Sequence, residues 1–269
     1  MAITTKPAAG WNDIGTEFTD RVVFVDIIGL TGSGRTKFAL SAPGPIALIH
    51  AHEKIGGLAQ SVVKSGKKIR EHRFGFAPTG NMEADRAKAT AVWLDFRSKF
   101  VDAQDNWAKS IVVDTGNEAW ELARYKAFGQ EAPKGNRMDM LYGPVNRDFR
   151  NLFNERFRLQ NKCNLLTVHQ MGDKWVDRLV DGTMKSFRTG GMERKGGFRE
   201  IPIMADVIIE MVRGDTDLSF NAIIRKGYFN ASVEGMLING SFMQDLGFTG
   251  LNFPSVMAMI AETPESDWT

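Results

Sequence analysis

A glycine-rich segment close to the amino terminus constrains the fold of this chain more than any other feature. The segment, GLTGSGRT, runs from Gly29 to Thr36 and follows an apolar run at residues 21–28. The run predicts a buried strand, and residues 35–41 predict the start of a helix. Glycines let the backbone turn its N–H groups around an anion, and a helix start adds partial positive charge. The segment therefore predicts a phosphate-binding loop; the alternative is a glycine-rich turn that binds nothing.

The segment matches the pattern G-x-x-x-x-G-K-[ST] except at Arg35, where the pattern has lysine. Arginine is a planar fork rather than a compact ammonium, so we expect Arg35 to keep nucleotide binding and to limit hydrolysis. Lys37 lies about 200° further round the helix and does not replace the lysine. The predicted nucleotide-binding residues of this segment are Gly29, Leu30, Thr31, Gly32, Ser33, Gly34, Arg35, Thr36 and Lys37.

A magnesium site is predicted from two residues that lie far apart in the sequence. Thr36 supplies the hydroxyl that such loops use to bind Mg²⁺. Asp114 ends the apolar run at residues 110–114 and is placed to hold the metal's water shell beside Thr36. The alternative is that Asp114 caps a helix.

Polar residues after two other apolar runs are candidates for catalysis. Glu53 either orients an attacking water or is a solvated loop acid. Gln170 either senses the terminal phosphate of a nucleotide or caps its strand, because the carboxyl ends of parallel strands line the ligand crevice. Glu53, Gln170 and Arg35 are the predicted catalytic residues. His50 and His52 share a strand face, but no third ligand is evident, so we expect no transition-metal site there.

The order of apolar runs and helical patterns predicts the fold class. Strands are predicted at residues 21–28, 45–50, 110–114, 164–169, 205–212 and 218–225, and helices at 85–100, 117–128 and 144–160. This alternation predicts an α/β fold with a mostly parallel sheet and helices on both faces. We expect a lead-in at 1–20, one domain at 21–255 and an acidic tail at 256–269. Asp26 falls inside the first strand, where a buried carboxylate needs a partner that the sequence does not identify.

A basic segment at residues 171–200 shows no clear periodicity and predicts a mobile loop. Residues 183–199 carry five basic residues against one acidic residue, with four glycines and the aromatic rings of Phe187 and Phe198. Such a segment suits single-stranded nucleic acid, and the alternative is a solvated surface loop. The predicted DNA-binding residues are Lys174, Lys185, Arg188, Arg194, Lys195 and Arg199.

Composition narrows the remaining classes of protein. The net charge is +2, so attraction to a polyanion has to come from a local patch. The one cysteine, Cys163, excludes a disulfide framework and a cysteine-clustered zinc site. The amino-terminal residues lack the apolar core of a signal peptide, and no apolar run has the length of a membrane span. We therefore expect a soluble cytoplasmic protein with no membrane partner.

Five segments in this order resemble the phage-encoded RecA-like ATP-binding proteins, some of which anneal single strands. They are GLTGSGRT, HAHEKIGG, SIVVDTGNEAWELAR, YGPVNRDFRNLF and NLLTVHQMGDKW. The resemblance runs from about Val22 to Phe253 and rests most on the third and fifth segments. It implies a RecA-like P-loop NTPase core that uses ATP and Mg²⁺ and supports DNA recombination or annealing.

By residue, the resemblance assigns Asp114 to magnesium, Glu53 to the water-activating carboxylate and Gln170 to the phosphate sensor. It implies that Arg225 and Lys226 reach the nucleotide of a neighbouring subunit. The implied partners are single-stranded DNA, further copies of the chain in a ring or filament, and phage or host replication proteins. A non-hydrolysing, nucleotide-gated scaffold protein and a small-molecule kinase remain as alternatives.

Overall fold

The structure is a computed structural model that describes residues 22–52, 55–130, 142–156, 163–181, 183–195, 197–214, 216 and 219–269. The predicted lead-in at 1–20 and the predicted catalytic residue Glu53 lie outside the described residues.

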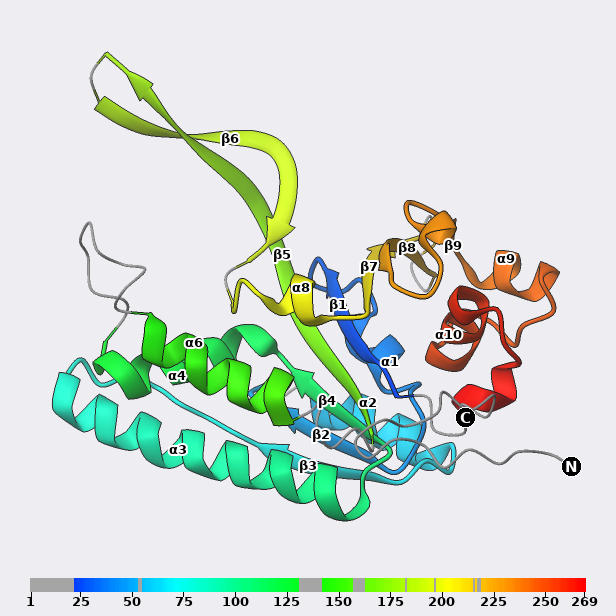
Figure 1. The fold of residues 1–269 in the computed structure, drawn as a ribbon, viewed down its shortest axis with the longest axis horizontal. Helices are drawn as coiled ribbons and strands as arrows, with labels where there is room; N and C mark the ends of the chain where they lie inside the picture. The colour runs from blue at the N-terminus through cyan, green and yellow to red at the C-terminus, as the bar shows by residue number, and fades with distance from the viewer. Residues whose placement is uncertain are drawn as a thin grey trace, which may run out of the picture.

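A mostly parallel sheet forms the centre of the molecule (Figure 1). Its strands are β1 (Phe24–Gly29), β2 (Ile46–His50), β3 (Ile69–Arg73), β4 (Ser110–Asp114), β5 (Asn164–Val180), β6 (Thr183–Arg194), β7 (Val207–Arg213), β8 (Phe220–Gly227) and β9 (Leu237–Ile238). The order β3-β2-β4-β5-β1-β7 is parallel throughout, and β8 and β9 continue the sheet antiparallel. One strand, β5, therefore separates β1 from β4.

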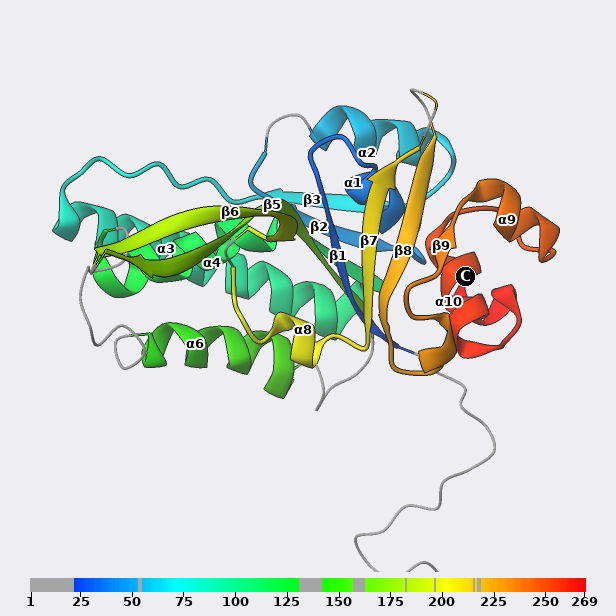
Figure 2. The same ribbon diagram turned by 90° about the horizontal axis from the view of Figure 1, so that it is seen from above.

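Helices cover both faces of this sheet, with α1 and α2 opposite α3, α4 and α6 (Figure 2). The helices are α1 (Arg35–Ala39), α2 (Ile55–Lys64), α3 (Met82–Asp102), α4 (Gly116–Phe128), α6 (Gly143–Arg150), α8 (Ile201–Met204), α9 (Gly240–Asp245) and α10 (Phe253–Ala261). Short π-helical turns continue α3 and α6 at Ala103–Trp107 and Asn151–Arg156. The predicted α/β class, with a mostly parallel sheet and helices on both faces, is confirmed.

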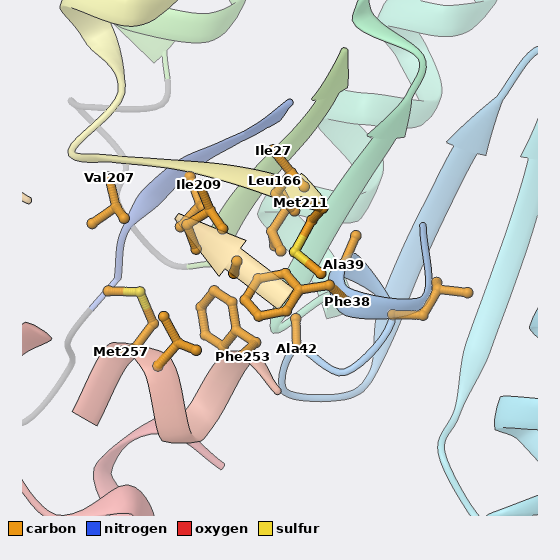
Figure 3. Packing of buried hydrophobic residues seen from close by; sticks show 14 of the residues in the cluster. Ile27, Phe38, Ala39, Ala42, Leu166, Val207, Ile209, Met211, Phe253 and Met257 are labelled. Atoms are coloured by element: carbon orange, nitrogen blue, oxygen red, sulfur yellow. The ribbon is translucent and has the colours of Figure 1, made fainter. Parts of the chain in front are cut away.

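The alternation of side chains along β1 explains why the core has two halves. Val25 and Ile27 point into one apolar cluster, with α1 and α10, while Phe24 points into the other, with α3, α4 and α6. Figure 3 shows the first cluster, where Phe38 of α1 and Phe253 of α10 pack beside Ile209 and Met211 of β7. The strand that leads into the glycine loop is therefore buried on both sides, which holds the loop in place.

The carboxyl-terminal residues pack against this core. The predicted boundary between residues 255 and 256 falls inside α10, whose side chains are almost all buried. A short turn follows at Glu265–Trp268. The Trp268 ring is 2% exposed and lies 6.4 Å from the ring of Phe253. Residues 256–269 are thus part of the folded body.

The basic segment at 171–200 is not the irregular loop that its sequence predicts. Strand β5 does not stop at residue 169 but continues to Val180 and pairs with β6 in an antiparallel ribbon. This ribbon, residues 171–194, projects from the body in Figure 1, and we call it the arm. The arm escaped detection because its pairing register shifts between Asp173 and Trp175 and β6 is exposed along nearly its whole length, so no apolar alternation marks it.

The single cysteine gives a first test of the fold. Cys163 is fully buried, and burial raises its pKa to about 12. Because the thiolate is the reactive form, we expect the folded protein to resist alkylation at about pH 8 and the urea-unfolded protein to react fully. Mass spectrometry after iodoacetamide treatment measures both. Equal rates in the two states would contradict the burial.

Candidate functional site

The glycine loop joins β1 to α1 in a geometry that only glycine fits at two positions. A Cβ at Gly29 would lie 2.4 Å from the carbonyl oxygen of Met211. Gly34 has φ +87°, and a Cβ there would lie 2.7 Å from the ring of Phe220. The loop is thus packed closely against β7 and the start of β8, while Leu30 and Thr31 at its tip are exposed.

A buried hydroxyl inside the loop has no protein partner in the described part of the chain. The Ser33 side chain is 2% exposed, and its Oγ forms no hydrogen bond. Such an orphan group costs free energy unless a ligand or water satisfies it. A phosphate oxygen seated in the loop is an acceptor of the required kind, so the residues present fit a nucleotide phosphate.

The structure brings together the two residues predicted to hold magnesium. Thr36 Oγ1 donates a hydrogen bond of 2.6 Å to Asp114 Oδ2. Asp114 is 2% exposed; burial raises its pKa, while the hydrogen bond from Thr36 and the charge of Arg35 oppose that rise. Within the described residues no group of three or more His, Cys, Asp or Glu could hold a metal. A hydroxyl and a carboxylate fit Mg²⁺, which takes its other ligands from water and phosphate.

Arg35 is bound to strand β5 in this structure. Its side chain is buried, and Nη1 donates to the carbonyl oxygen of His169 at 2.5 Å. Burial lowers the pKa of Arg35, while the carboxylates of Asp114 and Glu118 raise it. The guanidinium therefore lies close to the carboxylates of Asp114 and Glu118, and its hydrogen-bond partner is the carbonyl of His169.

Gln170 lies beside the first residue of the loop, since the β1–β5 register pairs it with Gly29. The sequence predicts that Gln170 lies at the end of its strand, but β5 continues beyond it to Val180. Its N–H donates to Asn117 Oδ1 at 3.0 Å, and its carbonyl accepts the N–H of Lys195 at 2.7 Å. Sequence reasoning missed Asn117. Its position three residues after Asp114, in the first turn of a helix, was the available signal.

The unexplained carboxylate of Asp26 has its partners on β5 and at the base of the arm. Its Oδ1 accepts hydrogen bonds from Thr167 at 2.9 Å and from His169 Nδ1 at 2.6 Å. Arg194 Nη1 lies 3.6 Å from Oδ2. Burial raises the pKa of Asp26, but the charges of His169 and Arg194 and these hydrogen bonds outweigh it and hold the pKa below its ordinary value.

Two residues expected on a DNA surface have structural contacts instead. The Arg194 side chain is 12% exposed and donates to the carbonyl oxygen of Phe198. Phe198 is buried, with its ring 5.4 Å from that of Trp120 and 5.5 Å from that of Phe149. Both side chains pack where the arm joins the body, so neither is among the exposed residues of the arm. The exposed members of the predicted set are Lys174, Lys185, Arg188, Lys195 and Arg199.

Arg225 and Lys226 contact their own subunit. Arg225 forms an ion pair with Glu210, with Nη2 and Oε2 2.5 Å apart. Lys226 Nζ donates to the carbonyl oxygens of Pro202, Ile203 and Ala205. In the sheet register, Lys226 lies beside Ile208 near the beginning of β7, whereas the glycine loop lies beside its end.

One hollow borders the loop, and another lies beyond the ends of β2 and β3. The first, of about 320 Å³, is lined by Gly34, Lys37, Phe38, Ser41, Met211, Ser219, Phe220, Gly240, Leu251 and Asn252. The other, of about 400 Å³, is lined by Ala51, His52, Arg73, Phe74, Gly75, Phe76, Ala77, Lys88, Glu118, Glu121 and Leu122. Lys37 Nζ lies 5.6 Å from the centre of the Phe220 ring, at the first hollow.

No protein-family model and no curated protein sequence matches the chain. Among solved structures, the RadB recombinase is similar at 11% identity, with a TM-score of 0.45 over 80% of this chain and 84% of that one. A KaiC-like protein from Pyrococcus horikoshii OT3 is similar at 15% identity, with a TM-score of 0.36 over 76% of this chain and 79% of that one. Both likenesses concern the fold and are too distant to transfer an activity. In the described residues, no helix has the length and apolar character needed to cross a membrane.

Proposed function

We propose that the chain is a RecA-like ATPase of the phage-encoded type, which binds Mg-ATP and single-stranded DNA in recombination or annealing. The contact between Thr36 and Asp114 carries the proposal. These residues lie 78 positions apart. Thr36 is in α1, which follows β1, and Asp114 ends β4, which is not a neighbour of β1 in the sheet. Their meeting at the carboxyl edge of a parallel sheet, beside a glycine loop, is the arrangement that Mg-nucleotide binding requires.

The strand order supports the proposed roles. With β5 between β1 and β4, Gln170 lies next to the glycine loop, where a phosphate sensor has to lie. The hollow of about 320 Å³ beside Gly34 and Lys37 is large enough for a nucleoside, with Phe220 as an apolar wall. Glu53 keeps its proposed water-activating role on the sequence resemblance alone. For Arg225 and Lys226 we propose contact with a neighbour's nucleotide after release from their present partners.

Nucleotide binding is tested by thermal stability. We expect Mg-ATP at about 100 times its Kd to stabilise the protein by about 2.7 kcal/mol, hence to raise Tm by several degrees. Thr36→Val and Asp114→Asn should lose the magnesium-dependent part of this shift because each removes an oxygen ligand. Thr183→Val, at the exposed tip of the arm, is the matched control and should keep it. No shift in the parent protein would refute the proposal.

The arm supports the DNA part of the proposal. Arg178 lies directly opposite Lys185, and Val176 opposite Phe187. Like charges opposite one another destabilise a strand pair, and an isolated two-stranded ribbon is only marginally stable. A phosphate backbone would relieve the repulsion, and the ring of Phe187, which is 41% exposed, offers a stacking face for unpaired bases.

We expect replacement of three arm cations, Lys174, Arg178 and Lys185, by alanine to weaken single-strand binding steeply. Each lost phosphate contact lowers the slope of log affinity against log salt by about 0.7, so the slope should fall by about 2. Fluorescence anisotropy over a salt series measures it. The matched control replaces the exposed Lys64, Lys68 and Lys99, which makes the same change in net charge. Equal loss in both triple variants would show that the arm is not the DNA site.

One specific observation favours each of the two alternative functions. The engagement of Arg35 with His169 favours a slow or non-hydrolysing scaffold protein. The hollow of about 400 Å³ beside His52 and Glu118 would suit the acceptor of a small-molecule kinase. Hydrolysis rates with and without single-stranded DNA distinguish the three: stimulation supports the proposed ATPase, and no hydrolysis supports the scaffold. Hydrolysis indifferent to DNA favours the kinase.

A further inference from the structure

A single peptide group lies between the glycine loop and helix α4. Its oxygen, the carbonyl of His169, accepts the hydrogen bond from Arg35 Nη1 at 2.5 Å. Its nitrogen, the N–H of Gln170, donates to Asn117 Oδ1 at 3.0 Å. Arg35 belongs to the proposed phosphate site, and Asn117 follows Asp114 by three residues. One rigid, planar unit of β5 therefore contacts both Arg35 of the proposed phosphate site and the first turn of α4.

The side chain of Asn117 holds both strands where the arm begins. While Oδ1 accepts from Gln170 on β5, Nδ2 donates to the carbonyl oxygen of Lys195, one residue after β6 ends. A backbone hydrogen bond joins the two strands at the same place, because Lys195 N–H donates to the Gln170 carbonyl at 2.7 Å. One amide therefore fastens the foot of the arm to the first turn of α4.

The surroundings of this peptide group leave it little room to adjust alone. A Cβ at Gly116 would lie 2.3 Å from His169 Nε2, and one at Gly197 would lie 3.3 Å from His169 Cδ2. The His169 ring is held by Asp26. Close-packed groups of this kind pass a displacement on to their neighbours, since they cannot absorb it.

We propose that Asn117 is a positioning residue that transmits nucleotide occupancy to the arm and so makes single-strand binding depend on the nucleotide. This rests on the function proposed above. A phosphate is an anion, so it competes with the neutral His169 carbonyl for the guanidinium of Arg35, because charge-assisted hydrogen bonds are about twice as strong as neutral ones. When Arg35 turns to the phosphate, its hydrogen bond to the His169 carbonyl is lost. This loss changes the hydrogen bonding of the peptide between His169 and Gln170, and Asn117 carries that change to Lys195.

The test compares DNA affinity with and without nucleotide in the full-length protein. The probe is a labelled oligothymidylate, and a fluorescent ATP analogue measures nucleotide affinity in parallel. We expect Mg-ATP to tighten DNA binding in the parent protein by a factor of about 5–150, the usual range for coupled sites. Asn117→Asp keeps an acceptor for Gln170 N–H and loses the donor to Lys195, and Asn117→Ala loses both. In each variant the factor should fall to about 1.

Both variants should bind the ATP analogue, and DNA without nucleotide, as the parent does. Asn146→Asp, on the partly exposed side of α6, is the matched control and should keep the parent's factor. The inference is overturned if the Asn117 variants keep that factor, or if they weaken nucleotide-free DNA binding and Tm together, which a merely structural role would do. A parent that binds both ligands without coupling overturns this inference alone. A parent that binds neither overturns the proposed function as well.

Discussion

Gly34→Asp should lower the affinity of the protein for nucleotide about 100-fold or more. Gly34 has φ +87°, and a Cβ there would lie 2.7 Å from the Phe220 ring. A side chain at this position is therefore strained and displaces an aromatic wall of the nucleoside hollow. The carboxylate also adds negative charge where phosphates are proposed to bind. Titration with a fluorescent ATP analogue measures the loss.

Gly66→Asp is the matched control for this variant. Gly66 has φ +96°, and a Cβ there meets nothing within 4 Å. The two substitutions therefore share the backbone strain and the added charge, and differ in position. Nucleotide affinity should be unchanged in Gly66→Asp. If Gly34→Asp binds the analogue as tightly as the parent, the nucleotide does not bind in the glycine loop.

Asp26→Asn should destabilise the fold by about 3–5 kcal/mol, the usual cost of breaking a buried charged pair. The carboxylate is fully buried, accepts from Thr167 and His169, and faces the cation of Arg194. An amide of the same shape leaves Arg194 without a counter-charge. Urea unfolding followed by circular dichroism measures the loss. Asp245→Asn, at an exposed position on α9, is the control and should have little effect.

The difference between the parent and Asp26→Asn should depend on pH in a defined direction. The folded-state pKa of Asp26 is below the ordinary value of 3.8. The carboxylate therefore contributes its full stability above that value and loses it as pH falls through the lowered folded pKa. Unfolding free energies should differ equally at neutral and mildly acidic pH and converge in strong acid. A difference that persists unchanged in strong acid would rule out charge as its cause.

Strands buried on both faces were predictable from the sequence because apolar runs mark them. The runs at 45–50 and 110–114 correspond to β2 and β4, whose residues are all buried. The edge strand β3 was missed, because most of its side chains are polar and partly exposed. The glycine loop and the approach of Thr36 to Asp114 followed from a motif in which residue type and spacing carry the chemistry.

Side-chain partners across the sheet could not be predicted, because they depend on register and packing. Nothing in the sequence around Asp26 names His169 as its partner, since their contact arises from the pairing of β1 with β5. The burial of Arg194 and Phe198 also arises from packing between distant segments. It could not be predicted, because both residues belong to a basic, glycine-rich stretch whose composition is typical of an exposed loop. Charge alone did not separate the residues at the foot of the arm from those along it.

The shared strand β5 makes the arm a lever. Residues 165–168 pair with both β1 and β4, whereas residues 171–180 extend beyond the body. Ten residues of strand span about 33 Å, so a rotation of only about 5° at the foot moves the tip by about 3 Å. A tilt too small to disturb the core would therefore carry the exposed cations Arg178 and Lys185 through roughly the spacing of one strand residue. The fulcrum of this lever is the peptide between His169 and Gln170.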